Sequence, residues 1–355
     1  MRTNPFIDVP LDARRIVIQV LSAIVFFGEI FYAIFVGLCQ FTFRRGPVTD
    51  ERLLRYHQRI QHVFCRNISM HPWLSLKISN PHGENFGKGA VIVCNHQSTL
   101  DPLCLLPLSP RILMAMNEKV WHTPIVSLVF RYAGFLPLAS DMNRRLAYFR
   151  KYTSKGYSVV VFAEGLRSKD CNIRRFHQGP FWIAEQLGLD LLPVFIHGPG
   201  HLMPVGVNYA NIGGLSVEIG KRITPSDSTY GLTAKERTRA MHRYFVEHYD
   251  EICRREETAT YFHHCLIGLF SRIGMKRAVR GELDANADYA TLVDVPDGST
   301  LEEVEYSDRS GVLSLLYAMV HPEQTVTPHN DEAIENLRHL YRKCHNLPTN
   351  LIFCS

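Results

Sequence analysis

The sequence predicts an α/β protein in which helices flank a mixed sheet, with an N-terminal membrane-associated helical segment before it and a small C-terminal βαβαβ module after it. Three observations lead to this fold class. Short apolar runs alternate with helical patterns between Leu74 and Arg255, an order typical of α/β folds. A long apolar stretch lies near the N-terminus. A shift in composition near Gly281 precedes a second, shorter alternation of strand and helix patterns.

The composition excludes several classes of protein. Apolar residues make up 46% of the 355 residues, the usual share for a folded globular protein. The formal net charge is +5 without a dense run of Lys and Arg, so we expect no nucleic-acid partner. Nine cysteines lie scattered without a CxxC pair, which favours a reducing compartment over a disulfide scaffold. A mean hydropathy of −0.07 excludes a polytopic membrane protein but allows one membrane segment.

The N-terminal apolar stretch runs from Ile16 to Phe43, and Glu29 is its only charged residue. As a helix it would be roughly 42 Å long, enough to cross a hydrocarbon core of about 30 Å. A lone carboxyl at mid-bilayer costs roughly 2–3 kcal/mol, so an interfacial or re-entrant helix pair is an alternative, and a buried core helix is another. We expect a membrane protein with the active site on the cytoplasmic side, because more arginines follow the stretch than precede it (Arg44, Arg45, Arg52, Arg55 and Arg59 against Arg14 and Arg15).

The central region provides the elements of the predicted sheet. Short apolar runs predict strands at Leu74–Ile78, Ala90–Cys94, Arg111–Met116, Ser158–Phe162, Leu191–Ile196 and Leu215–Ile219. Helical patterns, ended by glycine or limited by proline, predict helices at Leu103–Leu108, Pro124–Tyr132, Leu146–Lys155, Phe181–Leu187 and Lys235–Arg255. These elements divide the chain into a membrane-associated segment (1–48), a catalytic domain (49–258), and a linker with the C-terminal module (259–355).

The most informative residues follow the strand Ala90–Cys94, where Asn95 and His96 precede Asp101 in an H-x4-D pattern. The exits of strands are where α/β folds place their chemistry. A histidine that removes a proton from a hydroxyl needs a carboxylate to fix its tautomer. The pair can meet if His96 lies on the loop and Asp101 folds back from the first turn of the next helix. The alternative is a capping box between Ser98 and Asp101, which would start a helix without any catalytic role.

A second polar group follows the strand Ser158–Phe162. Glu164, Gly165, Arg167 and Ser168 combine a carboxylate, a glycine that allows close approach and an arginine, which suits a site for an anion or an acceptor. The alternative is a turn with a surface ion pair. Farther along, Pro193 interrupts a strand pattern, and a proline inside a strand predicts a sheet edge or the wall of a pocket.

In this order and spacing, the three blocks resemble those of the glycerolipid acyltransferase family, whose best-known member acylates lysophosphatidic acid. The resemblance covers roughly residues 50–255. It implies an enzyme in which His96 is the general base on an acceptor hydroxyl, Asp101 orients His96, and the hydroxyl attacks an acyl thioester of coenzyme A or acyl carrier protein. No metal or further cofactor is implied. The residues expected to bind the acceptor are Asn95, Gly134, Glu164, Gly165, Arg167 and Ser168.

The sequence departs from the family pattern at three positions. Leu166 stands where the family often has Thr, and Gln178 stands where it often has Lys. In the second family block, Ser140 occupies the position of an arginine that is tied to the acceptor phosphate, and Arg144 and Arg145 follow it. An arginine that binds phosphate with two hydrogen bonds has strict geometry. The acceptor is therefore expected to be lysophosphatidic acid or a lyso-lipid with another head group, such as an aminoacyl lyso-lipid.

The C-terminal stretch resembles the first motif of a class I methyltransferase in a degenerate form. Ser307 and Arg309 stand where two glycines of that motif belong, and Gly311 alone remains. Around it, the patterns predict βαβαβ, with strands at Leu301–Tyr306, Thr325–Pro328 and Leu351–Phe353 and helices at Val312–Val320 and Asp331–Cys344. The alternatives to an acyltransferase are a methyltransferase-related protein and a non-catalytic membrane adaptor. The intact H-x4-D block beside the broken glycine motif favours the acyltransferase.

Overall fold

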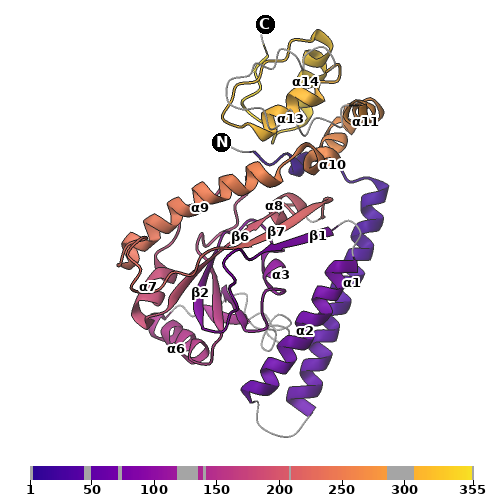
Figure 1. Cartoon of the computed structure of the whole chain (residues 1–355). Helices are drawn as coiled ribbons and strands as arrows, with labels where there is room; N and C mark the ends of the chain where they lie inside the picture. Colours follow the sequence, from indigo (N-terminus) through magenta and orange to yellow (C-terminus); the bar gives the residue numbers. More distant parts are fainter. Residues whose placement is uncertain are drawn as a thin grey trace.

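A mixed sheet forms the centre of the computed structural model, which describes residues 3–43, 49–70, 74–117, 135–138, 141–207, 209–285 and 308–353 (Figure 1). Within these ranges the sheet has seven strands in the order β1-β7-β6-β2-β5-β3-β4, and the pair β6–β7 alone is antiparallel. The predicted fold class, a mixed α/β sheet, is confirmed. The strand bounds are β1 Leu74–Ser79, β2 Ala90–Cys94, β3 Ile112–Asn117, β4 Phe135–Leu138, β5 Ser158–Phe162, β6 Asp190–His197 and β7 Gly213–Ile219.

Both faces of the sheet are buried, because side chains alternate along each strand and apolar residues occupy both sets of positions. Val91 and Val93 of β2 point into one core, which contains side chains of α6 (Met142–Thr153), α7 (Gly179–Leu187) and α9 (Ala234–Glu256). Ile92 points into the opposite core, which contains side chains of α3 (Asp101–Leu105) and α8 (Pro199–Leu202). This double burial explains the uninterrupted apolar sequences of the central strands.

Two features of the sheet differ from the sequence-based expectations. Strand β4 was not predicted, and the predicted helix Pro124–Tyr132 lies outside the described residues. The prediction that Pro193 marks an edge is wrong, because β6 lies between β7 and β2. Pro193 fits there because the register shifts by one residue between the pairs Val194–Ile219 and Leu191–Ile223. Such a bulge tolerates a residue that has no N–H to donate.

The N-terminal apolar stretch forms α1 (Ala13–Leu38), which continues as a short π-helical turn at Cys39–Phe43. The amphipathic helix α2 (Asp50–Met70) returns beside it to the sheet (Figure 1). The Tyr56 hydroxyl of α2 donates to the carbonyl of Ala33 in α1 at 2.9 Å. The two helices therefore form a hairpin whose outer helix is apolar and whose returning helix is mostly polar.

Within residues 308–353 the C-terminal stretch contains two helices and one β-bridge, and the predicted βαβαβ unit is not confirmed. The predicted helices are present as α13 (Val312–Val320) and α14 (Asp331–Lys343). The strand predicted at Leu301–Tyr306 lies outside the described residues, and the other two meet only in one bridge between Val326 and Leu351. The side-chain amide of Asn350 donates to three backbone carbonyls. In this place hydrogen bonds from a side chain join segments that strand pairing would otherwise join.

Gly311 has a packing explanation in this module. Its φ is +82°, and a Cβ there would lie 2.6 Å from Cγ of Leu337. The glycine therefore lets α13 begin against α14, without any need for a cofactor. The methyltransferase resemblance gains no support from this geometry.

The C-terminal module packs on segments from both ends of the chain. One apolar core joins α13 and α14 to α10 (Ala259–Ser271), α11 (Lys276–Ala285) and the N-terminal 3-10 turn Pro5–Asp8. Helices α10 and α11 occupy much of the stretch predicted as a linker. The domain boundaries 1–48, 49–258 and 259–355 stay predictions.

Candidate active site

The loop between β2 and α3 brings His96 and Asp101 together. His96 Nδ1 and Asp101 Oδ2 are 2.7 Å apart, although five positions separate the residues. The contact forms because His96 lies on the loop and Asp101 is the first residue of α3, where its carboxylate turns back. The same Asp101 oxygen also accepts the backbone N–H groups of Gln97 and Ser98, at 2.6 and 2.9 Å. The loop is thus wrapped around one buried carboxylate.

The capping-box alternative does not describe this loop. The Ser98 hydroxyl donates to the carbonyl of Met203 at 2.8 Å, and α3 begins without a side-chain cap. Asp101 instead binds N–H groups that precede the helix. Its role is to fix the loop and the imidazole.

The His96 ring lies partly at the surface, with 19% of the side chain exposed. One face of the ring stacks on Phe162 at the end of β5, with ring centroids 4.1 Å apart and an interplanar angle of 18°. Because Nδ1 faces Asp101, the neutral ring presents its lone pair at Nε2. Nε2 forms no hydrogen bond with the residues that the structure describes, so it is available to a substrate.

Glu164 binds the backbone of the loop that carries His96. Its two carboxylate oxygens accept the backbone N–H of His96 at 2.8 Å and that of Arg174 at 2.9 Å. The side chain is buried, and this burial raises its pKa to about 7, although the two N–H groups act in the opposite direction. Glu164 was predicted to bind the acceptor. The geometry gives it a positioning role through the backbone of His96.

The rest of the second block divides into an exposed tip and a buried end. Gly165, Leu166 and Arg167 are exposed, and the Arg167 side chain forms no ion pair within the described ranges. Gly165 has a φ of +71°, and a Cβ there would lie 2.9 Å from Cδ2 of His177. Ser168 is buried: its N–H donates to the carbonyl of His96 and its hydroxyl to Asp170. Arg167 is therefore the member of this block that could contact an anionic ligand.

Of the two remaining predicted binding residues, the structure describes Asn95, whose amide is occupied within the protein. The amide of Asn95 donates to the carbonyl of Ile196 and accepts its N–H, both at 2.8 Å. These bonds tie the exit of β2 to β6 and occupy both polar ends of the side chain. Gly134 lies outside the described residues, as does Ser140.

Sequence reasoning missed the residues behind the loop. Gln97 Nε2 donates to the Tyr249 hydroxyl at 2.6 Å and to the carbonyl of Cys171 at 2.9 Å. Tyr249 comes from the middle of α9, far away in sequence, and no local spacing could have paired it with Gln97. The position of Gln97 directly after His96 was the one available signal.

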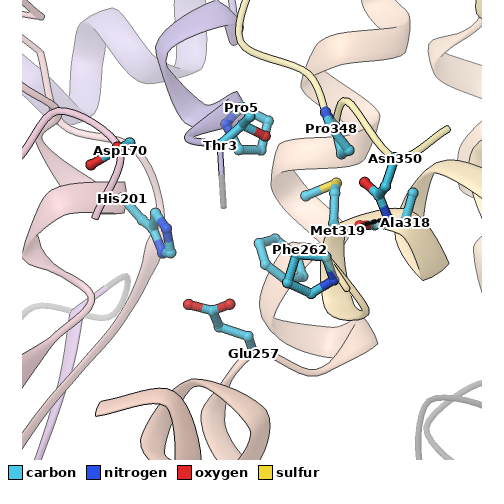
Figure 2. A pocket seen from close by; sticks show the side chains of 11 residues that line it. Thr3, Pro5, Asp170, His201, Glu257, Phe262, Ala318, Met319, Pro348 and Asn350 are labelled. Carbon is cyan, nitrogen blue, oxygen red and sulfur yellow. Dashed lines mark hydrogen bonds between the residues drawn. The ribbon is translucent and has the colours of Figure 1, made fainter. Parts of the chain in front are cut away.

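A second polar group lies farther behind the loop. Among the described residues, one group of side chains could hold a metal ion: His197, Cys253 and Glu257. All three are buried, and their ligand atoms lie within 4.8 Å of one another. His197 Nε2 lies 3.0 Å from Glu257 Oε1, the distance of a hydrogen-bonded pair, and this pair accounts for the geometry. Figure 2 shows Glu257 and His201 across a cavity of about 20 Å³ from Met319 and Asn350. That volume holds about one water molecule, so it is a junction between modules and not a substrate site.

Comparisons with known proteins agree with this geometry. The family described as Acyltransferase matches residues 75–197, which run from β1 to the end of β6. The chloroplastic 1-acyl-sn-glycerol-3-phosphate acyltransferase LPAT1 of Arabidopsis thaliana is 30% identical over 171 residues, 44% of this chain and 48% of that protein. The corresponding enzyme beta of Homo sapiens is 22% identical over 212 residues, 56% of this chain and 69% of that one. The chain spans about half the length of the curated plant relatives it matches.

One solved structure supports the fold. The 1-acyl-sn-glycerophosphate acyltransferase PlsC of Thermotoga maritima superimposes with a TM-score of 0.53 at 22% identity, over 66% of this chain and 97% of that one. The sheet, the His–Asp pair and the family match place residues 75–197 in the acyltransferase class of enzymes. The particular relatives are 1-acylglycerol-3-phosphate acyltransferases, and this chain is similar to them in that segment.

Proposed function

We propose that the protein is a membrane-bound O-acyltransferase that moves a fatty acyl group from an acyl thioester to a hydroxyl of a lyso-lipid. The observation that carries this proposal is the 2.7 Å contact between His96 Nδ1 and Asp101 Oδ2 at the exit of a buried strand. The acyltransferase family match over the same residues and the similarity to lysophosphatidic acid acyltransferases support it.

The geometry suits general-base catalysis. Asp101 accepts the Nδ1 proton of neutral His96, so Nε2 can take the proton of the acceptor hydroxyl as its oxygen attacks the thioester carbonyl carbon. The tetrahedral intermediate then expels the thiolate, which breaks the C–S bond. The imidazolium returns the proton to the sulfur. The products are the ester and a free thiol, and Asp101 stabilises the transient positive charge on His96.

The acceptor proposed is a lyso-lipid such as lysophosphatidic acid or an aminoacyl lyso-lipid. Arg167 supports an anionic acceptor, because it is exposed on the loop that follows β5, next to His96, without an ion pair in the described part of the chain. Ser140, at the position of the family's phosphate-binding arginine, supports an acceptor with a different head group. The donor proposed is acyl-coenzyme A or acyl carrier protein.

Membrane association is supported by the outer face of α1. A stripe of apolar side chains at helical spacing is exposed there, and Phe31 is 71% exposed. Its members are Ile16, Val20, Ile24, Phe27, Phe31 and Phe35. Apolar patches of this kind mark contact with a membrane or a partner. The range Arg15–Phe41 is apolar and long enough to cross a bilayer.

The hairpin favours the interfacial alternative over a transmembrane span. Asp50, at the start of α2, forms a 2.7 Å ion pair with Lys155 of the sheet domain, and Arg52 contacts the carbonyl of Gln40 in the π-helical turn that follows α1. Gln61, midway along α2, donates to the carbonyl of Pro107 at 2.9 Å. Both ends of α1 therefore lie on the side of the catalytic domain. We place α1 in the interface of one leaflet with its apolar stripe toward the acyl chains, on the cytoplasmic side.

The activity is tested with the full-length protein in mixed micelles. Palmitoyl-coenzyme A and palmitoyl-acyl carrier protein are offered with lysophosphatidic acid, an aminoacyl lyso-lipid and lysophosphatidylcholine, and the diacyl product is measured by mass spectrometry. Ester formation that requires His96 and proceeds normally in His82→Ala, a change of an exposed turn histidine, supports the proposal. Thioester hydrolysis without any esterified acceptor contradicts it.

The membrane contact is tested separately by flotation with phosphatidylglycerol–phosphatidylcholine vesicles. Phe27→Ser/Phe31→Ser/Phe35→Ser should reduce binding because it removes exposed apolar area. The matched control is Leu166→Ser, an exposed apolar side chain outside the hairpin. Equal flotation of the triple variant and the wild type would contradict an interfacial α1.

A further inference from the structure

A groove with a basic lining lies between the turn that precedes α7 and the N-terminal half of α9. Its volume is about 1000 Å³. Positively charged or titratable basic side chains form most of its lining: Arg175, His177, Lys235, Arg239, His242 and Arg243. Glu247 is the one acidic residue among the described lining residues, and the exposed side chain of Val246 adds apolar surface. The proposed chemistry leaves this cationic groove unused.

The cations of the groove lack the partners that other cations of the same helix have. At the C-terminal end of α9, Arg254 pairs with Asp250 at 2.9 Å and Arg255 with Glu218 at 2.8 Å. Within the described ranges, Arg175, Lys235, Arg239 and Arg243 form no ion pair. Lys235, Arg239 and Arg243 are four residues apart, so they stand on one face of α9 about 6 Å apart. A row of like charges repels itself and favours an anion with several charges.

The groove is connected to the catalytic loop through the turn before α7. His177 donates its N–H to the carbonyl of Ala163 at 2.8 Å, and its ring lies against Gly165. Arg174, directly before the groove, donates its N–H to Glu164, which in turn holds the N–H of His96. A ligand in the groove therefore lies beside the loop after β5, and Glu164 of that loop holds the backbone N–H of His96.

The position of the groove argues for a water-soluble ligand. In Figure 1, α7 and the N-terminal half of α9 lie on the left of the sheet, and α1 and α2 lie on the right. A bilayer that contacts the apolar stripe of α1 is thus on the other side of the molecule. The cations are set in a groove and not on a flat face, so a small ligand meets them from two walls. A membrane surface or the convex surface of a carrier protein would not enter in this way.

We propose that this groove binds the phosphate-bearing nucleotide end of coenzyme A, with the acyl thioester directed toward His96. Coenzyme A combines a diphosphate, a 3′-phosphate and an adenine ring, which match a row of cations beside the exposed side chain of Val246. Charge-assisted hydrogen bonds to phosphate oxygens would neutralise the row. The proposal rests on the proposed function, because it gives the donor of that reaction its binding site.

The first experiment measures binding without turnover. Titration calorimetry of coenzyme A is performed on the full-length His96→Ala protein in detergent, with and without Lys235→Gln/Arg239→Gln/Arg243→Gln. The matched control is Lys77→Gln/Arg254→Gln/Arg255→Gln, which also removes three positive charges, but from side chains that are already paired. We expect the groove variant to raise the Kd on the order of 10–100-fold and the control to change it less than about twofold.

The second experiment identifies the part of the ligand that is recognised. The wild type should bind dephospho-coenzyme A more weakly than coenzyme A, and pantetheine should bind equally to the wild type and the groove variant. Raising NaCl should weaken coenzyme A binding by the wild type, a measurement that needs no variant to fold. In the active protein, the groove variant should raise the KM for palmitoyl-coenzyme A.

Three results would overturn the proposal, and each is distinguishable from failure of the proposed function. Unchanged coenzyme A affinity in a folded groove variant would contradict the groove as the binding site, but it would not contradict the proposed acyl transfer. Loss of transfer from palmitoyl-acyl carrier protein alone, with normal use of palmitoyl-coenzyme A, assigns the groove to a carrier protein. Reduced flotation with anionic vesicles and unchanged coenzyme A binding assigns it to lipid. Failure of acyl transfer with intact coenzyme A binding would instead contradict the proposed function and leave the groove assignment in place.

Discussion

Two of the aspartates that lie at or just before the start of a helix bind different kinds of partner. Asp101, at the start of α3, binds His96 Nδ1 and two loop N–H groups through one oxygen. Asp308, before α13, binds the N–H groups of Leu313 and Ser314 and the Ser314 hydroxyl. The first carboxylate is directed at a side chain that reaches the surface. The second binds the helix that follows it and interacts with the half-buried Glu282 carboxyl of α11.

The difference shows what separates a catalytic motif from a structural one. In both places the sequence offers an acid near a helix start. Beside Asp101, Nε2 of the partly exposed His96 ring remains without a hydrogen bond within the described residues; Asp101 Oδ1 and Gln97 Oε1 also lack one, but these two atoms are buried. The partners of Asp308 belong to α13 and α11, and Gly311 fits against Leu337.

The largest effect is expected from His96→Ala. Loss of the general base should reduce acyl transfer by about 10²–10⁴-fold. The free energy of unfolding should change little, because the ring is partly exposed and stacks on Phe162 alone. Turnover and thermal unfolding measured on the same preparation check both parts. Activity within tenfold of the wild type would remove His96 from the mechanism.

The two aspartates should separate when each is changed to asparagine. Asp101→Asn should lose about 10²–10⁴-fold in activity, because the amide no longer fixes the tautomer of His96. Asp308→Asn should leave turnover within about twofold and lower the free energy of unfolding by about 1–2 kcal/mol through the lost helix cap. Turnover and denaturant unfolding are measured for both variants and compared with the wild type. Equal losses of activity in both variants would show that the two sites are not different in kind.

Glu164 gives a pH-dependent prediction for the catalytic region. Burial raises its pKa from 4.5 to about 7 in the folded protein. The folded state therefore binds more protons than the unfolded state between these values, and the free energy of unfolding falls as pH rises from about 4.5 to about 7. The contribution is on the order of 3 kcal/mol.

The measurement compares the pH dependence of thermal unfolding in the wild type and Glu164→Gln. The fall over this window should be smaller in the variant, which cannot ionise at this position. Parallel curves for the two proteins would mean that Glu164 is charged throughout the range. Glu185→Gln is a suitable control, because this carboxylate also accepts one backbone N–H but lies away from the catalytic loop.

A change of stability without a change of activity is expected at Gly311. Gly311→Ala should lower the free energy of unfolding by about 1–3 kcal/mol, because of its positive φ and the 2.6 Å approach to Leu337. Gly281→Ala, in α11 with open space around it, should be neutral or slightly stabilising. Denaturant unfolding checks both. The wild type should also show no heat with S-adenosylmethionine at millimolar concentration, and micromolar binding would restore a cofactor role for this glycine.

The sequence predicted the central strands and the pairing of His96 with Asp101, because both depend on local patterns. Strands such as Ser158–Phe162 are β-branched and buried on both faces, and the H-x4-D spacing can close within one loop. Glu164 as a support for the backbone of His96 was not predictable, since its two partners, His96 and Arg174, come from two other segments of the chain. Pro193 in a central strand depends on a bulge with β7. The helices α10 and α11 take their apolar contacts from both ends of the chain, which no local window contains.

The turn at Pro5–Asp8 has a consequence for how the protein is made. The Asp8 carboxylate accepts the backbone N–H groups of His345 and Asn346, at 2.9 and 2.6 Å, and Phe6 packs in the same core as α13 and α14. These partners leave the ribosome some tens of seconds after Asp8 at about 5–20 residues per second. During that time α1 is already complete, while the Asp8 carboxylate still lacks these two partners. The contact between Asp8 and the C-terminal module therefore forms late in biosynthesis, after α14 has emerged.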